Sequence, residues 1–161
     1  MTVKEYNKCV DKYTDNVYRF ILSSIRDMDE AQDVVQESFT RMWEKVDKIS
    51  FEKSKSYLFT TAYHTMIDRI RKGKRITLTE DTTYFEHNTN EQYSDLQEVL
   101  NSAINKLPKI QKDVILLRDY EGYSYEEIGE ITNLNESQVK VYIYRGRKTL
   151  RQYIGKIENV T

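Results

Sequence analysis

The sequence predicts an all-α fold of two small helical domains joined by an acidic linker, with a helix-turn-helix in the C-terminal domain. Only one Pro and five Gly occur among the 161 residues, whereas the turns of a strand-rich protein would need more of both. Apolar residues recur at helical spacing in long stretches, without a hairpin signal or an internal repeat. We therefore expect helical domains at 1–75 and 95–161, and a linker at 76–94.

The first two helices are predicted from their apolar stripes. The first stripe runs over residues 6–21, and its helix is expected to end between residues 23 and 27. Asp29, followed three residues later by Gln32, predicts the start of the second helix. The stripe of the second helix includes two aromatic side chains, which we expect in the core: Phe39 and Trp43.

A third helix is expected over 54–72, with Gly73 as its C-terminal stop. The composition changes after this helix: 77–94 is rich in Thr, Asn and acidic residues, and its apolar residues show no helical period. Residues 76–105 contain six acidic residues and no basic one. Composition leaves two interpretations of this linker open, an ordinary tether and an acidic mimic of a nucleic acid.

The second domain is expected to contain helices at 95–106, 108–120, 125–132 and 136–154, with Pro108 in a first turn and Gly122 at a helix end. The last two helices have strong start signals, in which a small polar residue precedes Glu or Gln by three positions. The two pairs are Ser124 with Glu127 and Asn135 with Gln138. Their short separation predicts a helix-turn-helix.

The last helix has two different faces. Val139, Ile143 and Leu150 recur at helical spacing and are expected to point inward. From residue 138 to residue 156 there are six basic residues and no acidic one, which favours a phosphate-rich partner. The opposite face is expected to meet duplex DNA through Ser137, Lys140, Val141, Tyr144, Arg145 and Lys148.

Several function classes are excluded by composition. Cys9 is the single cysteine, so neither an intrachain disulfide nor a zinc site built from several cysteines is expected. His64 is expected on the third helix and His87 lies in the linker, and no glycine-rich phosphate loop is present, so we expect no enzyme, cofactor or metal. No apolar run approaches the roughly 18 residues that span a bilayer, so a cytoplasmic protein without membrane insertion is expected.

Three stretches resemble bacterial sigma factors of the extracytoplasmic-function group, the short type with two globular domains. They are DEAQDVVQESFTRMWE at 29–44, SYLFTTAYHTMIDRIRK at 56–72, and LPKIQKDVILLRDYEGYSYEEIGEITNLNESQVKVYIYRGRKTL at 107–150. The resemblance implies that the first domain docks on core RNA polymerase and opens the downstream promoter element. It implies that the second domain reads the upstream element as double-stranded DNA. An anti-sigma factor, where one exists, is a further implied partner.

The resemblance also implies roles for single residues. Asp33, Gln36 and Glu37 match the positions that face the clamp helices of the largest polymerase subunit. On the third helix, Thr61 and His64 depart from the usual Ile and Asn, and His64 takes the position beside a base flipped from the melted non-template strand. His64 is either a base reader or a solvent-facing histidine. The aromatic side chains expected as stacking platforms, some of which must belong to the core, are Tyr57, Phe59 and Tyr63. The cations expected at phosphates are Arg69, Arg71, Lys72, Lys74 and Arg75.

Two other function classes remain open at this point. A free-standing helix-turn-helix regulator would bind its operator without a polymerase. A helical adaptor, whose basic helix is incidental, would bind neither DNA nor polymerase.

Overall fold

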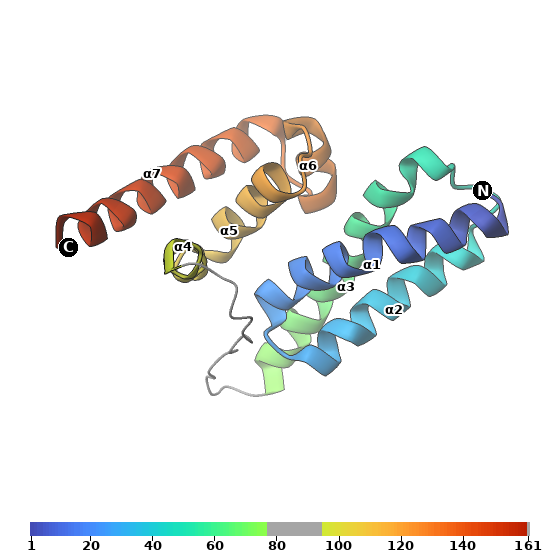
Figure 1. Cartoon of the computed structure of the whole chain (residues 1–161). Helices are drawn as coiled ribbons and strands as arrows, with labels where there is room; N and C mark the ends of the chain where they lie inside the picture. Colours follow the sequence, from blue (N-terminus) through green and yellow to red (C-terminus); the bar gives the residue numbers. More distant parts are fainter. Residues whose placement is uncertain (77–94, 161) are drawn as a thin grey trace. The chain divides into compact units, whose positions relative to one another are not determined.

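A computed structural model describes residues 1–76 and 95–160, and every regular element in these two ranges is a helix. The helices form two compact units, α1 to α3 and α4 to α7, and the division falls between residues 76 and 95 (Figure 1). The predicted all-α fold with two helical domains is confirmed. The linker expected at 76–94 lies, apart from Ile76, outside the described residues.

In the first unit, each of the three long helices packs against the other two. Phe20 of α1 contacts Phe59 of α3 at a ring-centroid distance of 5.5 Å. The Tyr6 hydroxyl donates a hydrogen bond of 2.9 Å to the carbonyl of Phe39, which joins α1 to α2. The elements are α1 (Val3–Ile25), α2 (Met28–Glu44), the short 3-10 helix η1 (Phe51–Lys53) and α3 (Ser54–Ile76).

Two helix boundaries in this unit differ from the prediction. The N-cap of α2 is Asp27 rather than Asp29, and its carboxylate accepts a hydrogen bond of 3.1 Å from the amide of Glu30. The preceding Arg26 has a φ of 62°, so the chain leaves α1 and enters α2 within two residues. Gly73 does not stop α3, which continues to Ile76. Glycine only lowers helix propensity, by about 1 kcal/mol, and ends a helix where the backbone turns left-handed.

In the second unit, α7 packs against α4, α5 and α6 (Figure 1). Pro108 is the N-cap of α5, and the helix expected at 108–120 ends in a wider π-helical turn, η2, before Gly122 at a φ of 77°. The buried core includes Ile128, Ile131 and Val139. The elements are α4 (Asp95–Asn105), α5 (Lys109–Ile115), η2 (Leu116–Tyr120), α6 (Tyr125–Thr132) and α7 (Glu136–Val160).

Two glycines allow close packing in the second unit, one under the turn between α6 and α7 and one between α7 and α5. A Cβ atom at residue 129 would lie 2.6 Å from the backbone oxygen of Leu134, and one at residue 146 would collide with the side-chain end of Ile115. At residue 129 the obstacle is backbone, so only glycine fits there, whereas at residue 146 the obstacle is the end of a side chain. Each glycine lies where two segments approach more closely than a methyl group permits.

Candidate nucleic-acid interface

The helix-turn-helix is held in shape by its two helix starts and the turn between them. Ser124 and Glu127 form a reciprocal capping box, with hydrogen bonds of 2.8 and 3.1 Å. The Asn135 amide donates to Gln138 Oε1 at 2.9 Å, and the Gln138 amide donates to Asn135 Oδ1 at 2.8 Å. Asn133 adopts a left-handed conformation with a φ of 64°. Both predicted starts are confirmed, and together they fix the direction in which α7 leaves the turn.

The two predicted faces of α7 are present in the structure. Val139 and Ile143 are buried, as is Gly146, whereas Leu150 is half-buried. The opposite face is solvent-exposed over several turns, and all six residues expected to meet DNA belong to it. They are Ser137, Lys140, Val141, Tyr144, Arg145 and Lys148.

The exposed face of α7 combines cations with apolar surface. Val141 and Tyr144, three residues apart on this face, are 43% and 63% exposed. A shallow hollow of about 240 Å³ lies on the first turns, lined by residues that include Ser137, Val141 and Arg145. In the DNA major groove, apolar side chains contact the thymine methyl group and arginines contact guanine. The surface therefore has the chemistry that base-edge recognition requires.

One neighbour of this face was not predicted. The Tyr125 ring lies 4.4 Å from the Arg118 guanidinium and 5.5 Å from Lys140 Nζ. Lys140 also forms an ion pair of 3.2 Å with Glu136. The spacing of Glu136 and Lys140, four residues on one helix, is visible in the sequence. The approach of Arg118 is not, since it depends on how η2 packs beside α6.

The predicted DNA-contacting residues of α3 separate into different environments. His64, Arg71 and Lys72 are exposed, and Tyr57 is half-buried. Phe59 is 0% exposed, so its prediction as a stacking platform is wrong: it packs in the core beside Phe20. Tyr63 is only 4% exposed and likewise stacks on Phe20. The side chains of Lys74 and Arg75 lie outside the described part of the chain.

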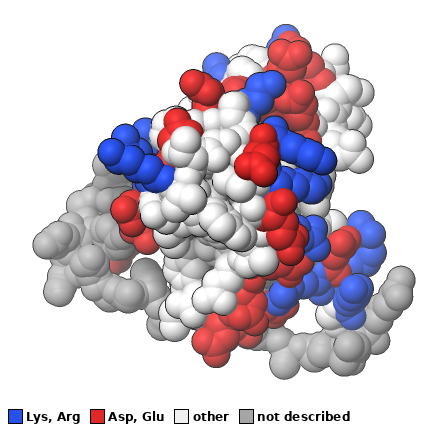
Figure 2. Space-filling view, turned by 90° about the vertical axis from the view of Figure 1, so that its right-hand side faces the viewer, with Lys and Arg blue, Asp and Glu red and all other residues white. Residues whose placement is uncertain are grey.

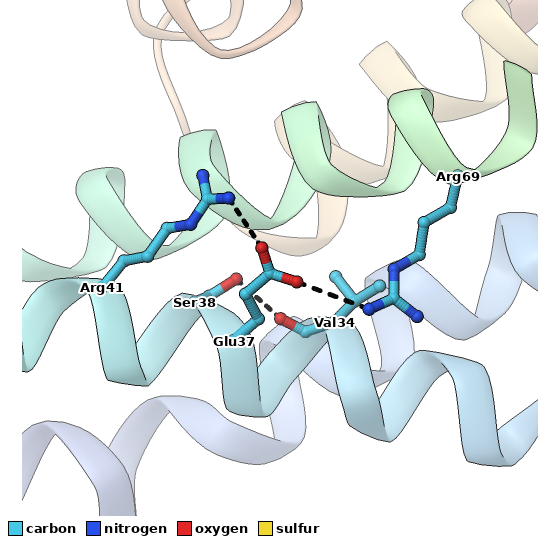
Figure 3. Close-up of polar contacts among 5 residues, drawn as sticks. All are labelled: Val34, Glu37, Ser38, Arg41 and Arg69. Carbon is cyan, nitrogen blue, oxygen red and sulfur yellow. Dashed lines mark hydrogen bonds and ion pairs between the residues drawn. The ribbon is translucent and has the colours of Figure 1, made fainter. Parts of the chain in front are cut away.

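The three predicted polymerase-binding residues all belong to α2. Asp33 and Gln36 are exposed, whereas Glu37 is half-buried between Arg41 and Arg69 (Figure 3). Trp43 was expected in the core, but 46% of it is exposed. Its ring packs edge-on against Tyr6 of α1 at a centroid distance of 5.0 Å.

Comparison with known proteins matches both units. Residues 9–76 match the family described as Sigma-70 region 2, and residues 97–150 match Sigma-70 region 4. The RNA polymerase sigma factor SigV of Bacillus subtilis is 32% identical over 151 residues, which cover 92% of this chain and 90% of that protein. The chain belongs to the sigma-70 family of RNA polymerase sigma factors.

The extracytoplasmic-function group is confirmed by further relatives. The ECF RNA polymerase sigma factor SigM of Bacillus subtilis is 29% identical over 86% of this chain and 88% of its own length. The structure of the sigma factor RpoE of Bartonella quintana, solved with the anti-sigma factor NepR, superposes with a TM-score of 0.77. It is 25% identical and covers 95% of this chain and 98% of its own.

The charges of this sigma factor are mixed locally. On the face drawn in Figure 2, acidic and basic side chains are interspersed, so neither sign forms one continuous field. Ion pairs within single helices also bring opposite charges together, as in Glu37 with Arg41 on α2 and Glu136 with Lys140 on α7. Among the described residues, no helix has the length and apolar character needed to cross a membrane.

Proposed function

We propose that this sigma factor binds core RNA polymerase through the exposed face of α2 and contacts promoter DNA through α3 and α7. One observation carries the proposal: the exposed cationic and apolar face of α7 lies within the region 4 match, at 97–150. The exposed acid and amide of α2, Asp33 and Gln36, lie within the region 2 match. The same chain thus offers a polymerase-binding surface and a DNA-reading surface.

Each interface has its own residues. On α2, Asp33, Gln36 and Glu37 would meet a basic helical surface of the polymerase, where complementary charge orients the partner. On α3, Tyr57 would stack on the melted strand and His64 would contact one base. Arg71 and Lys72 would hold phosphates. On α7, the six exposed residues would read the upstream element as double-stranded DNA.

The proposal also covers where the protein acts, whether it catalyses a reaction, and which protein regulates it. A protein that works on core polymerase and promoter DNA acts in the bacterial cytoplasm, and its role requires no reaction of its own. The solved relative RpoE is held by an anti-sigma factor, so we count an anti-sigma factor among the candidate partners. The domains that carry these roles are 1–75 and 95–161.

A run-off transcription assay with core RNA polymerase and a promoter library tests the proposal. We expect transcripts from a defined subset of promoters, only when both the chain and core enzyme are present. Tight binding to a DNA site without polymerase, combined with no transcription, would instead identify a free-standing helix-turn-helix regulator. If the chain binds neither DNA nor polymerase, it is an adaptor and the proposal is wrong.

A further inference from the structure

The carboxylate of Glu37 joins α2 to α3 through two arginines. Its Oε2 accepts a hydrogen bond of 2.7 Å from Arg41, one turn later on the same helix. Its Oε1 lies 3.4 Å from Nη2 of Arg69, which reaches across from α3 (Figure 3). Two cations from two helices therefore hold one carboxylate.

The surroundings of Glu37 place it at the boundary between core and solvent. The next residue, Ser38, is fully buried, and its hydroxyl donates a hydrogen bond of 2.8 Å to the carbonyl of Val34. The Glu37 and Arg69 side chains are 34% and 32% exposed. An ion pair at this depth is screened less by salt than one in open solvent.

This arrangement orients Glu37 without using all of its hydrogen-bonding capacity. An ionised carboxylate offers about four acceptor positions, and the two arginines occupy one on each oxygen. The exposed third of the side chain leaves acceptor positions open toward solvent. A cation of a partner would therefore bind a carboxylate that the two arginines already hold in one rotamer, which lowers the entropy cost of binding.

Arg69 differs from its neighbours on α3. Arg71 pairs with Asp68 of the same helix at 3.9 Å, and both side chains are 67% exposed. A DNA phosphate could approach Arg71 without disturbing the packing between helices. At Arg69 a phosphate would have to approach the Glu37 carboxylate, and repulsion between two anions a few ångströms apart opposes this.

We propose that Arg69 is a positioning residue for polymerase docking, which acts by holding the Glu37 carboxylate on the exposed face of α2, and that it is not a phosphate ligand. The inference rests on the proposed role of α2 in binding the polymerase. It replaces the sequence-based assignment of Arg69 to DNA. Arg71 and Lys72 keep that assignment.

The test is a double-mutant cycle on the affinity of the full chain for core RNA polymerase, measured by fluorescence anisotropy. We expect Arg69→Gln and Glu37→Gln each to weaken binding by roughly 10-fold, a loss that lies within the range of coupling between neighbouring residues. The double variant should bind about as weakly as Glu37→Gln alone, because Arg69 acts through Glu37. Arg69→Lys should restore part of the affinity. The inference is overturned if the fold-loss of affinity in the double variant equals the product of the two single losses. It is also overturned if Arg69→Gln binds core polymerase as tightly as the parent.

Arg71→Gln is the matched control, since it removes the same charge from the same helix. It should leave the affinity for core polymerase unchanged and flatten the salt dependence of open-complex formation. Arg69→Gln should weaken the affinity for core polymerase and leave the salt dependence of open-complex formation unchanged. A flattened salt dependence in Arg69→Gln would show that Arg69 contacts phosphate and would overturn the inference.

A charge-exchange variant distinguishes a loss of binding caused by misfolding from one caused by moving the carboxylate. Glu37→Arg with Arg69→Glu rebuilds the ion pair but moves the carboxylate to α3. We expect melting only slightly below that of the parent, because an arginine at residue 37 repels Arg41 one turn away, and polymerase binding weakened at least as much as by Glu37→Gln. Binding at the parental level would show that only the pair matters, against the inference. If the parent chain itself fails to bind core polymerase, the proposed function is wrong. If the parent binds and Arg69→Gln binds equally well, only the positioning role of Arg69 is wrong.

Discussion

The position that a Cβ atom would take on residue 129 lies 2.6 Å from the carbonyl oxygen of Leu134. The obstacle is backbone, and the Leu134 amide also donates a hydrogen bond of 3.0 Å to the Gly129 carbonyl. The turn of the helix-turn-helix is therefore packed directly on residue 129. Gly129 is needed there for its size, because its backbone is ordinary helix.

Gly129→Ala should destabilise the second unit by about 1–3 kcal/mol, the usual cost of overpacking. Thermal or urea unfolding followed by circular dichroism measures the loss. Gly73→Ala is the control, because nothing lies within 4 Å of its Cβ position and it sits inside α3. There the substitution should stabilise by up to about 1 kcal/mol through helix propensity. Equal effects of the two substitutions would contradict the packing argument.

Gly146→Ala should be destabilising for a different reason. Its Cβ would meet the terminal methyl group of Ile115, which is a side-chain atom that can be removed. Ile115→Val deletes that methyl group at a cost of about 0.5–1.5 kcal/mol. The double variant should therefore be less destabilised than the sum of the single variants. Additive unfolding free energies would show that the α5–α7 contact is not the obstacle.

Asp33→Arg should lower the affinity for core polymerase by reversing charge on the exposed face of α2, without changing helical content. Asp11→Arg makes the same change at an exposed position of α1, and it should bind as the parent does. Co-purification with core enzyme or anisotropy provides the measurement. Equal binding by the two variants and the parent would refute docking through α2.

Replacing Arg71 and Lys72 by Gln should weaken open complexes at all promoters. For each phosphate of the single strand that the variant no longer neutralises, the slope of log affinity against log salt should fall by about 0.7. His64→Asn should instead change the preferred base at one downstream position and leave that slope unaltered. Identical base preferences of the parent and His64→Asn across a promoter library would exclude a base-reading role.

The two faces of α7 should respond oppositely to substitution. Lys140→Ala with Arg145→Ala should preserve folding and abolish the advantage of promoters that carry an upstream element. Val139→Asp should unfold the second unit, because it buries an unpaired carboxylate at a position with 0% exposure. The first unit should still bind polymerase in that variant. If upstream-dependent transcription survives the double alanine variant, α7 is not the upstream reader.

Helix class, most helix positions and the caps of the helix-turn-helix follow from interactions within a few residues along the chain. Ser124 with Glu127 and Asn135 with Gln138 are each three apart, so their pairing is visible in the residue order. The opposite faces of α7, one buried and one exposed, follow from the same local periodicity.

The burial of single side chains and the ion pairs between helices were decided by the tertiary structure, because they depend on which helices pack against each other. On α3, Tyr57 and Phe59 have similar sequence surroundings, yet only Phe59 faces α1 and is buried. Trp43 lies on an apolar stripe and its ring contacts Tyr6 of α1, yet it remains 46% exposed. Arg69 pairs with Glu37, 32 residues away. No local pattern encodes that pairing, since it exists only where the α3 surface approaches the α2 surface and a long side chain can bridge the two.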